Sequence, residues 1–362
     1  MLGGLLAILG FVAIMTVLII IHEAGHFFVA KLAKVKVLEF GLGFPPRLWG
    51  IRYGGTLYSI NAIPLGGFVR MLGEEDPSEA GSLAGRGTGT RFLVMVAGPF
   101  MNFILTVLLF SVLFMIPQDV PVGQVAIQEV VPGSPAEQAG ILASDTIIAV
   151  DGRDLDSDID LRYSIALNLG KEMTWIIERG RERFPVEITA RLNPPEGQGA
   201  TGILVTTLNV HFERRSEPFW SAPILGLERT GQVLVLVKNE FVKWVSGGSS
   251  PEVMGPIGMA QIFGEVVQVE EFRFVDRVIT VINLSAVISL SLAIFNILPI
   301  PALDGGRIMF VVIEWVRRGK RIPPQREGIV HLVGFVMLIT LGLLISLVDL
   351  GRIFRGESLL GG

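Results

Sequence analysis

Four long apolar stretches limit what this chain can fold into more than any other feature of its sequence. They cover residues 1–21, 92–116, 278–303 and 328–348, and only His331 interrupts the last of them, near its start. A helix needs about 20 apolar residues to cross the hydrocarbon core of a membrane. We therefore expect a multi-span α-helical membrane protein with four transmembrane helices.

The distribution of lysine and arginine predicts how these spans are oriented. Basic residues gather in residues 31–91, after the first span, and in residues 307–326, between the third and fourth. Short basic loops usually face the cytoplasm, so we expect both termini and the long stretch between spans two and three to lie outside. The first span lacks the basic start and small-residue cleavage site of a signal peptide, so we expect it to be retained.

The outer stretch consists of a polar part and an amphipathic part. Residues 117–215 contain short β-rich runs separated by turn signals. These runs are Val122–Val131, Thr146–Val150, Trp175–Glu178 and Val186–Ala190. Between Pro218 and Gly247 apolar residues recur at helical spacing, which predicts an amphipathic helix. This helix is predicted to lie on the membrane surface or against the polar domain, or to be a plain linker.

The loop after the first span contains a segment that is unusual for a cytoplasmic loop. Residues 47–72 are rich in glycine and apolar residues, and Tyr53–Thr56 (YGGT) is typical of a hairpin turn. Side chains alternate along Leu57–Ala62 as they do in a strand. We expect a β-hairpin that dips into the membrane edge, where its backbone must be buried in protein or line a wet cavity.

Cysteine is absent and histidine is scarce, which narrows the possible metal sites. The chain has no cysteine and four histidines, so thiolate zinc sites, Fe–S clusters and disulfides are excluded. Any metal must be held by histidine, aspartate or glutamate. The net charge of −4 gives no sign of a nucleic-acid partner.

The strongest chemical signal is His22–His26 (HEAGH), which ends the first span. On a helix, residues four apart lie about 40° apart around the axis and one turn along it, so both imidazoles can reach one metal ion. Glu23 lies beside that face, where a carboxylate can activate water. Ionisable groups at membrane depth are costly and usually functional. The sequence therefore predicts a catalytic metal site.

A catalytic zinc site needs a third protein ligand, and two residues are candidates. Asp304 and His331 both lie at the predicted cytoplasmic ends of their spans, so depth alone excludes neither. Asp304 is favoured because prolines and glycines surround it in Asn296–Gly306 (NILPIPALDGG), as expected where broken helix lines a cavity.

These motifs together resemble the site-2 protease family of intramembrane zinc metalloproteases, in particular the bacterial members often called RseP or RasP. HExxH lies in a first span and NxxPxPxLDG in a later one. Further matching segments are Gly41–Phe44, Asn61–Val69, Ala97–Asn102 and Gly255–Gly258. The chain departs from members with two PDZ domains, because residues 117–215 have room for only one.

The resemblance implies the roles of individual residues. His22, His26 and Asp304 would bind one Zn²⁺ per chain, and Glu23 would be the general base. Asn296 would contact the substrate or the oxyanion, although a structural cap is an open alternative. The hairpin, through Asn61, Gly66 and Gly67, would also contact the substrate, and an edge strand within Leu57–Val69 would hold it extended.

The outer domain, with Val130–Leu142 (VVPGSPAEQAGIL) and Val150–Gly152 (VDG), resembles a bacterial PDZ domain. Such a domain binds chain ends by strand addition, and Val122–Val125 is one candidate for its carboxylate loop; the alternative is a spacer that binds no peptide. The family implies single-span membrane substrates, such as anti-sigma factors or remnant signal peptides, and contact with membrane lipid. It also implies a bacterial cytoplasmic (inner) membrane, with the PDZ-like domain outside.

The chain is accordingly divided into eight consecutive segments. They are 1–31, span one with HExxH; 32–91, the cytoplasmic-side loop with the hairpin; 92–116, span two; 117–215, the PDZ-like domain; 216–277, amphipathic linker helices; 278–306, span three; 307–327, a cytoplasmic loop; and 328–362, span four and the tail. The rival function is a zinc transporter or receptor without hydrolysis. Glu23 argues against it, since transport needs no water-activating carboxylate, and no internal repeat supports it.

Overall fold

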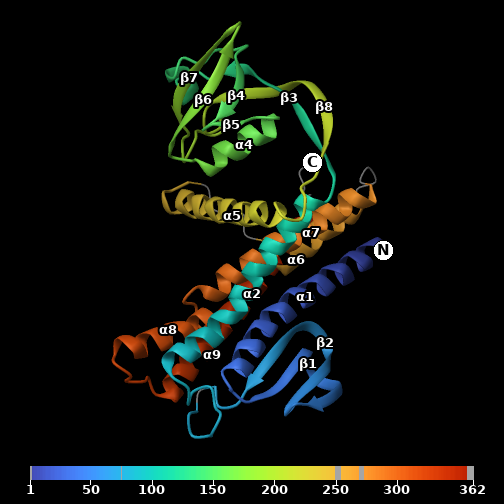
Figure 1. Cartoon of the computed structure of the whole chain (residues 1–362), viewed down its shortest axis with the longest axis vertical. Coiled ribbons are helices and arrows are strands. Elements are labelled where there is room, and N and C mark those ends of the chain that lie inside the picture. Colours follow the sequence, from blue (N-terminus) through green and yellow to red (C-terminus); the bar gives the residue numbers. More distant parts are fainter. Residues whose placement is uncertain (1, 75, 249–253, 269–272, 357–362) are drawn as a thin grey trace. The chain divides into compact units, whose positions relative to one another are not determined.

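The computed structural model describes residues 2–74, 76–248, 254–268 and 273–356. These residues form two compact units (Figure 1). The first combines Met1–Leu113 with Val253–Gly362, and the second is Phe114–Glu252. The second unit is therefore an insertion into the sequence of the first.

The first unit is built on long apolar helices. Its helices are α1 (Leu2–Leu32), α2 (Thr88–Met115), α6 (Pro256–Gln268), α7 (Phe274–Ile297), α8 (Asp304–Val316) and α9 (Pro324–Phe354). Four of the described helices, α1, α2, α7 and α9, are long and apolar enough to cross a membrane, as the sequence predicts. Most large apolar side chains of α9 are exposed, among them Leu332, Phe335 and Leu347, as expected of a helix in contact with lipid.

The third apolar helix ends earlier than the sequence predicts. We expect a span to residue 303, but α7 ends at Ile297, because Pro299 and Pro301 cannot continue a helix. Ala302 takes a positive φ of 76°, and α8 then begins at Asp304. The predicted loop over residues 307–327 is helical in its first half, where α8 extends to Val316. Its basic residues apart from Arg307 all follow the end of this helix.

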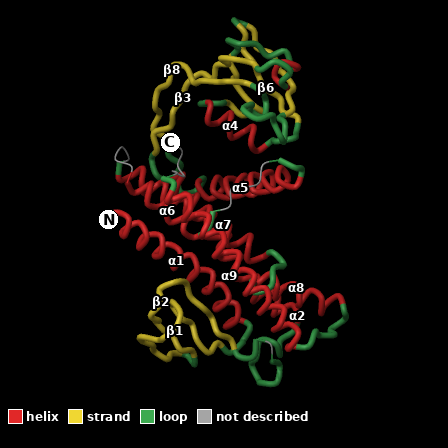
Figure 2. The backbone as a smooth tube through the Cα atoms, turned by 180° about the vertical axis from the view of Figure 1, so that it is seen from behind, coloured by secondary structure: helices red, strands yellow, loops and turns green. Residues whose placement is uncertain are grey.

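The predicted hairpin is present but is more folded than a simple hairpin. Strands β1 (Val37–Tyr53) and β2 (Thr56–Met71) are antiparallel, and Gly54 and Gly55 take the positive φ of the predicted turn. Each strand folds back on itself, so the pairing gives four adjacent segments. Their order is 67–71, 37–42, 57–60 and 47–53. Residues 57–60 are thus interior, and 67–71 forms an edge. Strand β2 lies beside α1 (Figure 2).

The second unit is an α+β domain with an attached helix, and all of its printed strand pairings are antiparallel, as expected of the PDZ-like α+β domain that the sequence predicts. Its elements are β3 (Gln118–Val130), α3 (Pro135–Gln138), β4 (Thr146–Val150), β5 (Arg153–Asp154), α4 (Asp158–Leu167), β6 (Glu172–Arg179), β7 (Glu182–Thr189), β8 (Ile203–Arg215) and α5 (Ala222–Val245). The sheet order is β7-β6-β4-β3-β8, with β5 beside β4. The core lies between this sheet and α4, around Trp175, Leu161 and Ile177. All four predicted β-rich runs are strands.

Helix α5 is the predicted amphipathic helix, and it packs against α4 through polar contacts. Asn239 donates to the Ala166 carbonyl oxygen at 2.7 Å, and Tyr163 donates to Gln232 at 3.0 Å. The apolar residues that predicted this helix, such as Phe241 and Trp244, are at least half exposed. The polar face therefore belongs to the domain, and an apolar face is left without a partner in the described part of this unit.

Candidate metal centre

His22 and His26 project from one face of α1 near its end, as their spacing predicts. Both are buried, and their Nε2 atoms lie 3.2 Å apart. Asp304 reaches the same point from the first turn of α8. Its Oδ2 atom lies 3.0 Å from Nε2 of His22 and 3.2 Å from Nε2 of His26. Among the described residues, these three form a group that could hold a metal ion.

The spacing of these three atoms fits a tetrahedral metal. Zinc bonds of about 2.0–2.1 Å at tetrahedral angles place neighbouring ligand atoms roughly 3.3 Å apart. The distances of 3.0 to 3.2 Å are close to that value. Three ligands also leave a fourth position open, as a catalytic site requires.

Helix α2 orients both imidazole rings from behind. The Nδ1 atom of His26 lies 2.7 Å from the Val94 carbonyl oxygen, which is an acceptor. The Nδ1 atom of His22 lies 3.4 Å from the side-chain amide of Asn102. Ligand histidines usually bind an outer partner through the nitrogen that does not face the metal. Each ring therefore presents Nε2 to Asp304.

Two glycines create the space for this arrangement. A Cβ atom on Gly98 of α2 would lie 2.2 Å from Nε2 of His26 and 2.7 Å from Nε2 of His22, inside the proposed ligand cluster. A Cβ on Gly25 of α1 would lie 2.2 Å from the Ala97 carbonyl oxygen. The two helices thus cross at glycine residues. Any side chain at position 98 would occupy the space between the proposed ligand atoms, so glycine there leaves room for a metal ion.

Glu23 lies in a cavity of about 350 Å³ that also contains His26 and Asp304. One wall is the edge segment 67–71, since Phe68, Val69, Arg70 and Met71 all line the cavity. The Val69 backbone approaches the Glu23 carboxylate, and the Gly67 Cβ position lies 3.8 Å from Glu23 Cγ. A carboxylate, the metal-capable group and a free strand edge therefore share one space.

The other candidate residues lie apart from this group. The Nδ1 atom of His331 accepts the Ala302 N–H at 2.9 Å, so this ring supports the turn before Asp304 and does not join the cluster. Asn296 donates to the Leu292 carbonyl oxygen in its own helix at 2.9 Å. Asn61 is buried and donates to the Gly43 carbonyl oxygen at 3.0 Å. Neither asparagine lines the cavity, and Gly67 directly precedes Phe68, which does.

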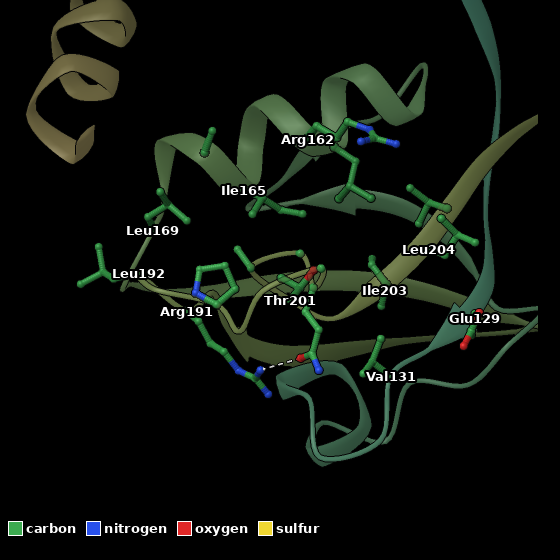
Figure 3. A pocket seen from close by; sticks show the side chains of 18 of the residues that line it. Glu129, Val131, Arg162, Ile165, Leu169, Arg191, Leu192, Thr201, Ile203 and Leu204 are labelled. Atoms are coloured by element: carbon green, nitrogen blue, oxygen red, sulfur yellow. Dashed lines mark hydrogen bonds between the residues drawn. The ribbon is translucent and has the colours of Figure 1, made fainter. Parts of the chain in front are cut away.

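The second unit has a cavity of its own, of about 620 Å³, between α4 and β8 (Figure 3). Apolar side chains such as Ile165, Leu169 and Ile203 line it, together with the loop Gly197–Thr201. Arg191, which binds Gln198 at 3.1 Å, and Lys243 add positive charge. Residues 122–125, the candidate carboxylate loop, lie in β3 and do not line this cavity.

Comparisons with known proteins agree with a protease. The sequence model of the family described as "Peptidase family M50" matches residues 10–341. A putative zinc metalloprotease of Clostridium perfringens is 34% identical over 92% of this chain and 95% of its own. Zinc metalloprotease RasP of Oceanobacillus iheyensis is 27% identical over 96% and 99%.

A plant protein and one solved structure also match. The chloroplastic membrane metalloprotease ARASP of Arabidopsis thaliana is 30% identical over 96% of this chain and 79% of its own. Among solved structures, a PDZ domain of an SdrC-like protein from Listeria monocytogenes aligns with 22% of this chain and 85% of that chain. The sequence identity is 21% and the TM-score is 0.21.

Proposed function

The chain belongs to peptidase family M50, the site-2 proteases, and from this premise we propose that His22, His26 and Asp304 hold its zinc and that Glu23 is its general base. The observation that carries the proposal is the cluster of His22 Nε2, His26 Nε2 and Asp304 Oδ2 atoms within 3.2 Å of one another. Two of these residues, His26 and Asp304, line one cavity with Glu23. The protein is thus an intramembrane zinc metalloprotease.

The residues divide the chemistry of peptide hydrolysis among them. When bound, zinc supplies Lewis-acid chemistry that makes water more acidic. Glu23 takes the proton from the attacking water at its carboxylate and delivers it to the leaving amine. The Val94 carbonyl oxygen and the Asn102 side chain contact the imidazole rings at Nδ1, and both rings are buried from bulk water.

The edge segment 67–71 positions the substrate. A transmembrane helix hides its amides in hydrogen bonds, so it must unwind before the scissile bond is accessible. Among the described residues, segment 67–71 pairs only with 37–42, and its other edge borders the Glu23 cavity. We propose that an unwound substrate adds to this edge as a strand. Segment 57–60, which the sequence also offered for this role, is interior and cannot accept a strand.

The substrates proposed are single-span proteins of a bacterial cytoplasmic membrane, such as anti-sigma factors or remnant signal peptides. The basic loops support an orientation in which the metal centre lies near the cytoplasmic face and residues 117–215 lie outside. The exposed apolar face of α5 supports a location of this helix at the lipid surface.

The second unit is proposed to select substrates, in one of two ways. As a PDZ-like receptor, its α4–β8 cavity would bind a chain end, whose carboxylate Arg191 and Lys243 would attract. As a size filter, it would only obstruct substrates with a bulky outer domain. Three cationic side chains, Arg162, Arg191 and Lys243, line this cavity against one acidic side chain, Glu129, and this excess of positive charge favours the receptor.

Purified protein incubated with a model single-span substrate tests the function directly. We expect cleavage within the span, its loss with a zinc chelator, and its recovery when zinc is restored. The same protein in zinc-loaded vesicles should carry no zinc flux. Zinc flux without cleavage would instead support the transporter.

A further inference from the structure

The side chain of Asn102 is buried with one of its two polar atoms unsatisfied. Asn102 is fully buried on α2, and its Nδ2 atom lies 3.4 Å from Nδ1 of His22. Its Oδ1 atom is buried and has no hydrogen-bond partner in the described part of the chain. A buried carboxamide oxygen without a partner is costly and calls for an explanation.

The position of the proton on the neighbouring His22 ring supplies an explanation for this unsatisfied oxygen. A histidine that binds a metal through Nε2 must keep the lone pair there, so its proton is on Nδ1 and that atom is a donor. The Nδ2 group of an asparagine is also a donor, and two donors cannot bond. The oxygen and nitrogen ends of a carboxamide have the same shape, so their orientation is decided by their partners.

We infer that Asn102 is a positioning residue of the metal centre, whose amide oxygen accepts the Nδ1–H of His22. Turning the amide by 180° places the unsatisfied oxygen at the position 3.4 Å from His22 Nδ1 that Nδ2 otherwise occupies. The bond fixes the His22 tautomer that offers Nε2 to the metal. This inference rests on the proposed function, since it assumes that His22 is a ligand.

The register of α2 against α1 supports this role. His26 already has an acceptor of the required kind in the Val94 carbonyl oxygen at 2.7 Å. Val94, Gly98 and Asn102 are spaced by four and lie on one face of α2, one turn apart. Along this face Val94 provides the acceptor for His26, Gly98 leaves the space for the metal, and Asn102 lies next to His22. An acceptor at the third position gives each of the two imidazoles an outer acceptor for its Nδ1–H.

The role of the side chain can be separated from the packing of its helix. The bonds that tie α2 to α7 at this point use the backbone oxygen of Asn102, which accepts from Ser289 Oγ at 2.9 Å. Thr106 donates to the same oxygen at 2.9 Å and to the Ala286 carbonyl oxygen at 3.3 Å. A change of the Asn102 side chain leaves these backbone acceptors in place, whereas Ser289→Ala removes only a packing bond.

Zinc affinity of the full-length protein in detergent, measured by chelator competition, tests the inference. Loss of an outer-shell partner typically weakens binding by about 10- to 100-fold, and we expect this for Asn102→Leu. Asn102→Asp retains an acceptor oxygen and should bind zinc at least as well as the unchanged protein. Ser289→Ala should lower the unfolding temperature but leave zinc affinity unchanged.

The absorption spectrum of the cobalt-substituted protein gives a readout that packing alone would not alter. We expect the Asn102→Leu spectrum to change and those of Asn102→Asp and Ser289→Ala to match the unchanged protein. Unaltered zinc affinity in Asn102→Leu, or equal losses in Asn102→Asp and Asn102→Leu, would overturn the inference. Retention of zinc by His22→Ala would instead overturn the ligand set, so the two failures are distinguishable.

Discussion

Glu23 and Asp304 are two carboxylates in one cavity to which we assign different tasks. Asp304 Oδ2 lies within 3.2 Å of both histidine Nε2 atoms, whereas Glu23 borders the edge segment. Replacing the carboxylate by a carboxamide should therefore have different effects at Glu23 and at Asp304.

The Glu23→Gln variant should retain zinc, but its rate of substrate hydrolysis should fall by about 100-fold or more, because only the general base is removed. Asp304→Asn, His22→Ala and His26→Ala should lose both zinc and cleavage. Metal analysis of each purified variant, beside cleavage of a model substrate, measures the two properties separately. Cleavage by Glu23→Gln at a rate close to that of the unchanged protein would disprove the assigned mechanism.

Gly98→Ala should abolish zinc binding, because the added methyl group would stand 2.2 Å from Nε2 of His26. The matched control is Gly89→Ala, on the same helix, where a Cβ meets nothing within 4 Å. Zinc content after dialysis compares the two variants. If Gly98→Ala retains stoichiometric zinc, the metal lies elsewhere.

The three residues of the proposed ligand triad could be named from sequence, but the groups that support them could not. HExxH and LDG are local patterns, and the position of Asp304 among prolines favoured it over His331. The acceptors Val94 and Asn102 depend on how α1 and α2 cross, which no local pattern reveals. Small residues at Gly25 and Gly98 were the available signal for that crossing. The proposed roles of Asn61 and Asn296 stay predictions, and the contacts of both are with backbone near them.

Helix α8 presents Asp304 to the metal centre, and a buried ion cluster anchors its far end. Glu314 binds Arg91 of α2 at 2.5 Å and Arg321 at 3.2 Å. Burial disfavours the charged form, but Arg91 and then Arg321 hold the pKa of the Glu314 carboxyl below its ordinary value. The charged cluster therefore helps to fix α8 against α2.

This cluster should make stability depend on pH. A folded-state pKa below the unfolded value of about 4.3 means that the stabilisation is present above that pH and is lost as pH falls through the folded pKa. Glu314→Gln should lower stability by about 3 kcal/mol near neutral pH, because it leaves Arg91 buried without its charge partner. Thermal unfolding from pH 7 downward should show the two proteins converging in acid.

Replacement of the exposed Glu79 by Gln serves as the control for a general charge effect. Its unfolding temperature should stay within experimental error of the unchanged protein. A constant difference between Glu314→Gln and the unchanged protein at every pH would contradict the ion-pair explanation.

The elements differ in how far sequence could predict them. Apolar runs indicated the four long helices, and the glycine pair indicated the turn at Gly54. The alternation over residues 57–62 could not show that each strand folds back, because pairing between segments far apart in sequence leaves no local pattern. For the same reason β8 was missed, since its partner β3 lies about 80 residues earlier.

Whole-molecule orientation can be tested by cysteine labelling, because the chain contains no cysteine. Single cysteines at the exposed positions Ser78 and Lys320 should react only from the cytoplasmic side. A cysteine at the exposed Glu182 should react only from outside. Outside labelling at Ser78 would invert the orientation.

Removal of the PDZ-like domain tests its proposed part in substrate selection. Gln118 and Arg215 are paired at the ends of β3 and β8, so residues 118–215 can be replaced by a short linker. We expect zinc content and cut position to be unchanged, and substrates with intact outer domains to become cleavable. An unchanged preference for trimmed substrates would place the selection elsewhere.

Point changes in the α4–β8 cavity separate the receptor from the size filter. Arg191→Ala should reduce cleavage of trimmed substrates if the cavity captures their chain ends. If Arg191→Ala has no effect while the deletion relaxes selection, the domain excludes by bulk alone. The exposed Arg181 provides a matched control for the loss of one positive charge.

The distribution of the proposed ligands along the chain has a consequence for biosynthesis. A ribosome completes HExxH and then the α2 face long before it reaches Asp304. Until α8 emerges, the nascent enzyme has two histidines but no third ligand, and it cannot cut neighbouring spans while its own are still inserting. Chains truncated just before residue 304 should therefore retain far less zinc than chains truncated after α8, and equal zinc in both would show that activity is not timed in this way.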